Sequence, residues 1–174
     1  MKKLVVLLLS VVYLFGIEVG EKPKEVILAG KDGGYVKDNK PFSTNDIRGK
    51  VYIVFYVDPD EKDKNEVFAE ALKKKHYNRA EYGSIAIVNM AATWKPDFAI
   101  EMLLEKKQKE FPDTIYIKDK KSVLVKEWGI ANDESDILLF DKDGKLLFYK
   151  AGKMTPSDMK KVFNLIEERI SWNL

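Results

Sequence analysis

The chain lacks cysteine altogether and has a single histidine among its 174 residues. The absence of cysteine excludes disulfide bonds, thiol catalysis and thiolate metal sites. The lone histidine, His76, follows three lysines at the polar end of a predicted helix, and no serine is marked out as a nucleophile, so no catalytic triad is indicated. Stability must come from core burial, for which an apolar content of 45% is sufficient.

Long apolar runs are also scarce. The longest, Leu4 to Phe15, is shorter than the roughly 20 residues of a transmembrane helix. Lys2 and Lys3 precede it and Gly16 follows it, which predicts a cleavable signal peptide over residues 1–16, a periplasmic location and no stable membrane insertion after cleavage. Leu14 fits a cleavage site poorly, so a buried N-terminal helix or an uncleaved anchor stays an alternative. Residues 17–174 are predicted to form a single domain.

The mature chain has no excess charge of either sign. Residues 1–16 contain two lysines and no acidic residue, so their removal leaves 28 basic and 28 acidic residues. Nucleic-acid binding usually requires a basic excess on one face, and this balance argues against such a partner.

The central feature is the apolar run Val51 to Val57, which predicts a strand buried on both faces. A helix is predicted over residues 65–75, with Val67, Phe68, Ala71 and Leu72 inward, and a second strand over 85–88. Strand, helix and strand at this spacing indicate a right-handed βαβ unit. Before this unit, residues 17–50 are predicted to hold one or two short strands, with a turn at Gly33-Gly34.

The second half of the chain predicts helices and a hairpin. A helix over 97–109 should bury Phe98, Met102 and Leu103 or Leu104. Ser122 is the predicted cap of a helix ending at Trp128. The remaining predictions are a strand over 114–117, an antiparallel hairpin of strands 137–140 and 146–149, and a last helix that is capped by Thr155 and buries a stripe of Met159, Val162, Phe163, Ile166 and Ile170.

This order of elements resembles the thioredoxin fold in the extended form of peroxiredoxins and periplasmic thioredoxin-like reductases. Longer phrases, including FYVDPDEKDKN, VNMAATWKPDFAIE, KQKEFPDTIYIKD and LLFDKDGKLLFYKAGK, are similar to the YtfJ family of bacterial periplasmic proteins. The resemblance implies an α/β fold, a thioredoxin-like three-layer sandwich with a mixed central sheet flanked by helices. It implies no biochemical activity, because none is established for that family.

The same resemblance locates what is missing. Where redox relatives have Cys-x-x-Cys, this chain has Asp60-Glu61-Lys62-Asp63, and Ser135 replaces their cis-proline. Carboxylates cannot exchange disulfides, so a reductase, isomerase or thiol peroxidase mechanism does not carry over, and no catalytic residue, metal ligand or cofactor is assigned.

Two loops form the candidate binding surface. One carries four acidic residues and the other a tryptophan: Asp58, Asp60, Glu61 and Asp63, and then Trp94, Lys95 and Pro96. Both follow the carboxyl ends of neighbouring strands, so Asp60 and Trp94 are expected to share a surface. For the acidic loop the alternatives are a solvated helix start that matches the helix dipole, or a hard-cation site, although the calcium-loop pattern is absent. Trp94 either anchors a partner or packs over the following helix.

Three functional hypotheses remain open. The first is a non-redox periplasmic module that binds a protein or peptide through the two loops. The second is a ligand- or metal-dependent enzyme that uses the acidic loop. The third is a scaffold that self-associates through its hairpin or an edge strand.

Overall fold

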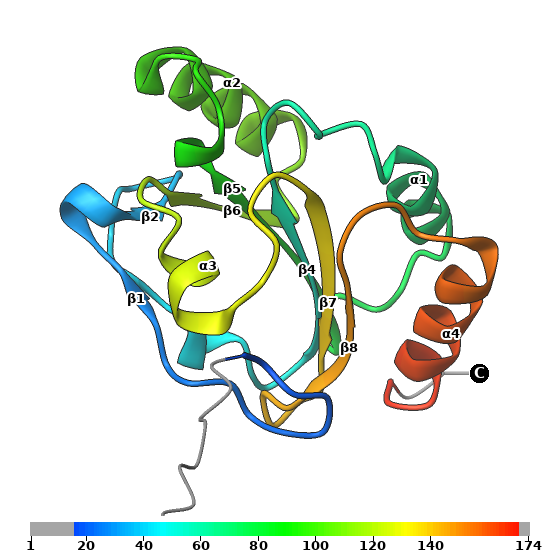
Figure 1. The fold of residues 1–174 in the computed structure, drawn as a ribbon. Coiled ribbons are helices and arrows are strands. Elements are labelled where there is room, and N and C mark those ends of the chain that lie inside the picture. Colours follow the sequence, from blue (N-terminus) through cyan, green and yellow to red (C-terminus); the bar gives the residue numbers. More distant parts are fainter. Residues whose placement is uncertain (1–15, 171–174) are drawn as a thin grey trace, which may run out of the picture.

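The computed structural model describes residues 16–170, so the predicted signal peptide lies outside the described residues except for Gly16. A mixed six-stranded sheet forms its centre, in the order β2-β6-β5-β4-β7-β8. Its strands are β2 (Gly33–Tyr35), β4 (Val51–Val57), β5 (Tyr82–Asn89), β6 (Thr114–Asp119), β7 (Ser135–Phe140) and β8 (Leu146–Lys150). The helices are α1 (Glu66–Lys74), α2 (Asp97–Glu110), α3 (Val123–Trp128) and α4 (Pro156–Glu167) (Figure 1).

The predicted βαβ unit is confirmed. β4 pairs in parallel with β5 across α1, and β5 pairs in parallel with β6. β7 lies antiparallel to β4 on the other side and forms the predicted hairpin with β8. The carboxyl ends of β4, β5 and β6 therefore meet at one edge of the sheet, together with the start of β7, and this edge positions the two candidate loops.

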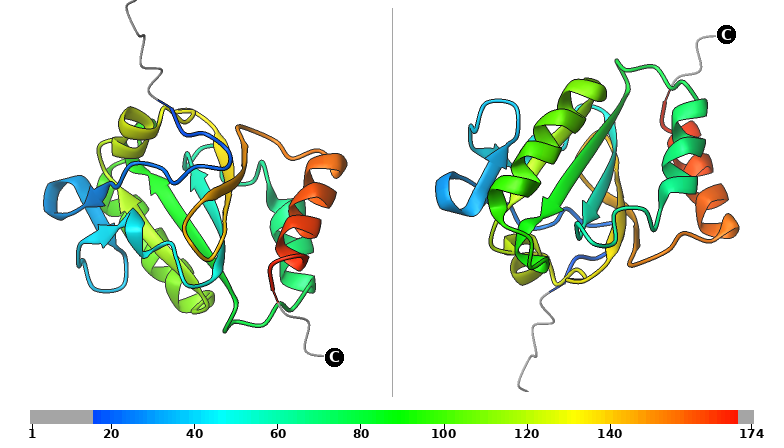
Figure 2. Two further views of the ribbon diagram at one scale, coloured as in Figure 1. Left: turned by 90° about the horizontal axis from the view of Figure 1, so that it is seen from below. Right: turned by 90° about the horizontal axis from the view of Figure 1, so that it is seen from above.

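Helices cover both faces of the sheet. α1 and α4 lie side by side on one face, where Phe68, Leu72, Val162 and Ile166 are buried in one apolar cluster (Figure 2). Ile100 and Leu104 of α2 form another cluster with Val88 and Met90.

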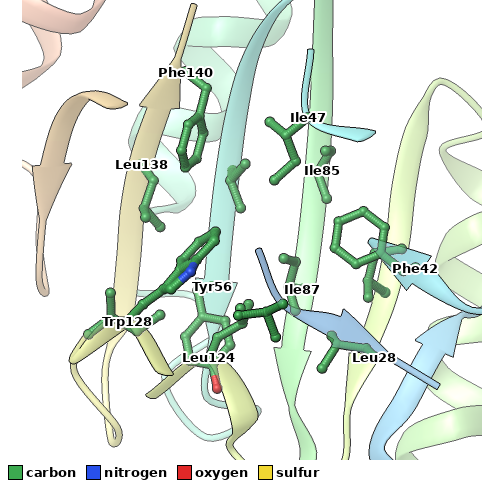
Figure 3. Close-up of a cluster of buried hydrophobic side chains, with 14 of the residues drawn as sticks. Leu28, Phe42, Ile47, Tyr56, Ile85, Ile87, Leu124, Trp128, Leu138 and Phe140 are labelled. Atoms are coloured by element: carbon green, nitrogen blue, oxygen red, sulfur yellow. The ribbon is translucent and has the colours of Figure 1, made fainter. Parts of the chain in front are cut away.

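α3 and the lead-in segment pack on the opposite face of the sheet. There Trp128 and Leu124 of α3 surround Tyr56, and Leu28 and Phe42 come from the short strands β1 (Ile27–Leu28) and β3 (Phe42–Ser43) (Figure 3). The predicted three-layer thioredoxin-like α/β fold is thus confirmed.

Gly33 and Gly34 are not a turn, as the sequence suggested, but begin the edge strand β2 beside β6. Gly33 has φ of +136°, and a Cβ on it would lie 1.8 Å from the carbonyl oxygen of Lys118. Glycine is needed because the two backbones approach too closely for any side chain. In the sequence the Gly-Gly dipeptide is typical of a turn, but here it allows the edge strand β2 to pair with β6.

The predicted cap of α3 is also wrong. Ser122 adopts a left-handed conformation with φ of 50° and makes no capping bond. Asp119 at the end of β6 takes this role, because its carboxylate accepts the backbone N–H groups of Val123 and Leu124 at 2.8 and 3.0 Å. Gly129 closes the helix in the left-handed conformation, as predicted.

α1 buries Phe68 and Leu72 as predicted, whereas α2 buries a face that differs from the predicted one. Val67 is exposed while Phe68 and Leu72 are buried. On α2 the predicted inward residues Phe98 and Met102 are exposed. Of the two predicted alternatives, Leu103 is exposed and Leu104 is buried, together with Ile100. α2 is therefore apolar on two faces, and only one of them contacts the rest of the domain. Between residues 16 and 170 no helix is long and apolar enough to cross a bilayer.

Candidate functional site

Asp58 begins the acidic loop but is not a surface residue, contrary to the prediction. It is 4% exposed, and its Oδ1 accepts the N–H of Asp60 at 2.8 Å. Burial raises the pKa of Asp58, and the hydrogen bond from the Asp60 N–H opposes this rise. Asp58 therefore shapes the turn that presents the rest of the loop, because its side chain fixes the backbone at Asp60.

Asp60 links the two candidate loops, as the fold predicted. Thr93 Oγ1 donates to Asp60 Oδ2 at 2.7 Å, and Lys95 Nζ donates to Oδ1. The Lys95 ammonium and then the Thr93 hydroxyl lower the pKa of Asp60, since both stabilise its ionised form. The two loops thus form one continuous surface at the carboxyl edge of the sheet.

The other acidic side chains of this loop are paired with lysines. Glu61 contacts Lys64 at 2.8 Å, and Asp63 contacts Lys62 at 2.5 Å. Across residues 16–170 no three carboxylates or histidines converge closely enough to hold a metal ion. Because neighbouring lysines neutralise these carboxylates, the loop has little negative electrostatic potential with which to attract a cation.

Large apolar side chains dominate the surface beside this loop. Trp94 is 86% exposed, so the alternative in which it packs over α2 is wrong. Phe98 and Met102 are each 68% exposed and lie one turn apart on the outer face of α2, with Leu103 next to Met102 at 60%. These four residues are called the α2 ridge below. Pro96 directly precedes α2 in an extended conformation and thus separates Trp94 from the helix.

A polar clamp centred on Asn65 ties the end of the acidic loop to the start of β7 and to the segment before α4. Asn65, 5% exposed, donates to the carbonyl of Ser135 at 2.9 Å and to that of Gly152 at 3.1 Å, and its own Oδ1 accepts the Met154 N–H at 2.8 Å. The described residues contain no cis peptide bond. Sequence reasoning missed Asn65, because a single asparagine before a helix is indistinguishable from an ordinary cap.

Buried carboxylates under α3 were also missed. Tyr56 Oη donates to Asp119 Oδ2 at 3.0 Å, and Tyr149 Oη donates to Asp136 Oδ2 at 3.1 Å. Asp119 and Asp136 are both fully buried, and Asp136 Oδ1 is the one buried side-chain N or O atom between residues 16 and 170 without a hydrogen-bond partner. Asp119 is the last residue of β6, and Asp136 lies at the start of β7. At such positions an aspartate in the sequence indicates a turn rather than a buried group.

Residues 17–169 match the family described as "Bacterial protein of unknown function (YtfJ_HI0045)". The chain belongs to the YtfJ family. It is 28% identical over 145 residues to an uncharacterized protein of Haemophilus influenzae, covering 82% of this chain and 77% of that one. It is 26% identical over 132 residues to the uncharacterized protein YtfJ of Escherichia coli, covering 74% and 72%.

Solved structures place this YtfJ-family chain among thioredoxin folds. A peroxiredoxin-like protein from Aquifex aeolicus superposes with a TM-score of 0.59 at 12% identity, covering 89% of each chain. A thiol-disulfide isomerase from Corynebacterium glutamicum gives 0.58 at 16% identity, covering 79% of this chain and 90% of that one. At these identities the likeness concerns the fold alone, and the absence of cysteine separates this chain from thiol chemistry.

Proposed function

We propose that this YtfJ-family protein is a periplasmic, non-redox binding module that captures a protein partner through the α2 ridge and the joined loops at residues 58–64 and 92–96. The observation that carries the proposal is the exposure of Trp94, Phe98, Met102 and Leu103 on one short stretch of chain. Monomeric proteins rarely leave such side chains together in water unless the patch has a use. Tryptophan and methionine are also typical of interface centres.

The paired charges beside the ridge fit the same role. Asp60 is held by Thr93 and Lys95, and such charged pairs surround an apolar centre as a polar rim. Export rests on the predicted signal peptide at residues 1–16. No specific observation favours the alternative of a metal-dependent enzyme, since lysines occupy the exposed loop carboxylates.

The decisive experiment places a photoreactive benzoyl-phenylalanine at position 98 of the full-length protein in cells. Cross-linking should give a discrete adduct with one periplasmic protein, and fractionation of the same cells checks the location. The matched control places the probe at Val19, which is 64% exposed but lies in the lead-in segment. A Met102→Lys change should remove the adduct at position 98 while circular dichroism shows an unchanged fold. Equal labelling from both positions, or none from position 98, contradicts the proposal.

A further inference from the structure

Residues 129–134, which connect α3 to β7, contact the acidic loop and the end of β5, the strand that leads to the second loop. The carbonyl of Glu134 accepts the N–H of Asp58 at 3.0 Å, and its carboxylate contacts Lys64 Nζ at 2.5 Å. Asn132 Oδ1 accepts from the side chain of Asn89, the last residue of β5, at 3.1 Å. We call residues 129–134 the latch segment, because a change in its position would move the anchors of both loops.

Asp136 holds the latch segment from beneath. Its Oδ2 accepts the N–H of Ala131 at 3.0 Å and the Tyr149 hydroxyl at 3.1 Å. The Ala131 N–H is also 3.1 Å from the Tyr149 oxygen, so the three groups form one closed cluster. The carboxylate is fully buried under this segment, and its Oδ1 has no hydrogen-bond partner.

The charges and titratable groups that face Asp136 do not compensate a negative charge. Tyr149 comes from β8, and Tyr56 lies opposite Asp136 on β4 and is itself bonded to Asp119 from β6. The latch segment contributes the carboxylate of Glu134, which raises the pKa of Asp136 further. Among residues 16–170 no lysine or arginine donates a hydrogen bond to Asp136.

Burial is the largest cause of a raised pKa of Asp136, to about 6, and the hydrogen bonds from Tyr149 and from the backbone N–H groups of Ala131 and Gly152 oppose it. An ionised carboxylate in this position is removed from bulk solvent and has no lysine or arginine bonded to it, so burial disfavours its charged form. Opening of the latch segment would let water reach the carboxylate and return its pKa to about 3.9.

We propose that Asp136 makes the latch segment sensitive to pH, so that loss of its proton to solvent favours an opened segment and loosens the two loops of the binding surface. The regulatory meaning of this device rests on the proposed binding function, but the opening itself does not. The closed segment is favoured at low pH, because burial favours the protonated acid. With a pKa of about 6 closed and about 3.9 open, the open population rises about tenfold between pH 5 and pH 7.5.

Amide hydrogen exchange on the mature protein tests the proposal without any partner. After correction for intrinsic exchange rates, the Ala131 and Asp58 amides should exchange much faster than the core amide of Ile166 in α4. Both should also lose about tenfold protection between pH 5 and pH 7.5. In Asp136→Asn this pH-dependent loss should disappear. In Tyr149→Phe, which keeps the carboxylate but removes a donor, it should persist and shift to higher pH.

Three results would overturn the proposal. Exchange of Ala131 as slow as that of Ile166 would mean that the segment opens only with the whole domain. A pH dependence that survives in Asp136→Asn would assign it to another group. If the protection of the Asp58 amide from hydrogen exchange did not change with pH, opening of the latch segment would not affect the binding surface. None of these results bears on the cross-link at position 98, so the two proposals fail separately.

Discussion

α2 and α4 both carry apolar residues at helical spacing, yet they use them differently. α4 turns its stripe to the sheet, with Val162 and Ile166 fully buried. α2 buries Ile100 and Leu104 and leaves Phe98 and Met102 in water. Periodicity indicates that a helix has an apolar face, but a helix with two such faces needs two bodies to cover them. The outer face of α2 therefore adds little to the stability of the domain, and it is part of the surface that we propose for partner binding.

The largest effects should come from the inner faces of both helices, because each packs buried apolar side chains within the domain. Ile166→Ala and Ile100→Ala each remove a buried side chain and leave a cavity, at a cost of about 2–5 kcal/mol in the free energy of unfolding. Ile166 should cost more, since it is 0% exposed and Ile100 is 3% exposed. Urea denaturation measures both. A cost below about 1 kcal/mol for Ile100→Ala would mean that α2 is not docked as described.

Asp136, a buried residue of β7 outside both helices, should affect the stability of the whole domain. Asp136→Asn should raise the free energy of unfolding at pH 7 by about 1–2 kcal/mol, because a buried charge is no longer required. The pKa of Asp136 is raised to about 6, so wild-type stability should fall as pH rises from about 4 to 6, and the gain should vanish near pH 4. Urea titrations at pH 4 and pH 7 decide this. An equal gain at both values would assign the effect to packing.

The start of each helix gives a smaller contrast. α4 begins with a capping box in which Thr155 and Asp158 bond each other's backbone N–H, whereas α2 begins at Pro96 without a side-chain cap. Thr155→Ala should cost about 1 kcal/mol. The Thr155 N–H and hydroxyl lower the pKa of Asp158, so its contribution is present at neutral pH and lost below about pH 4. Urea denaturation of Thr155→Ala against wild type should show a difference at pH 7 that shrinks at pH 3.

The smallest effect belongs to the outer face of α2. Phe98→Ser and Met102→Ser should each change the free energy of unfolding by less than about 0.5 kcal/mol, because both side chains already face water. Thermal melts against the wild type measure this, and Val19→Ser is the matched control. A loss above about 1 kcal/mol at Phe98 would show that the ridge packs within the domain, and the contrast with α4 would fail.

The sequence predicted what depends on pattern and local chemistry. The apolar run of β4, the Asp-Gly hairpin and the capped start of α4 all appear within a few residues of their expected places. The sequence did not predict the features that depend on tertiary contacts. The outward ridge of α2 depends on which side of the helix the sheet occupies, and the Asn65 clamp and the Tyr56–Asp119 hydrogen bond join residues far apart in the chain. Asp60 and the second loop could be placed together because parallel strands share an edge.

Asn65 and Asp58 fix the two ends of the acidic loop independently of its tip. Asp58 is tied to Glu134 through its backbone, and Asn65 to Ser135, Gly152 and Met154. The residues between them make no contribution to the core. When both ends of a loop are anchored, the entropic cost of closing the loop grows slowly with its length, by about 0.6 kcal/mol for each doubling. Positions 61–63 are therefore a natural grafting site, where foreign peptide sequences of variable length can be displayed while Asp60 keeps its bonds to the second loop and Lys64 its contact with Glu134.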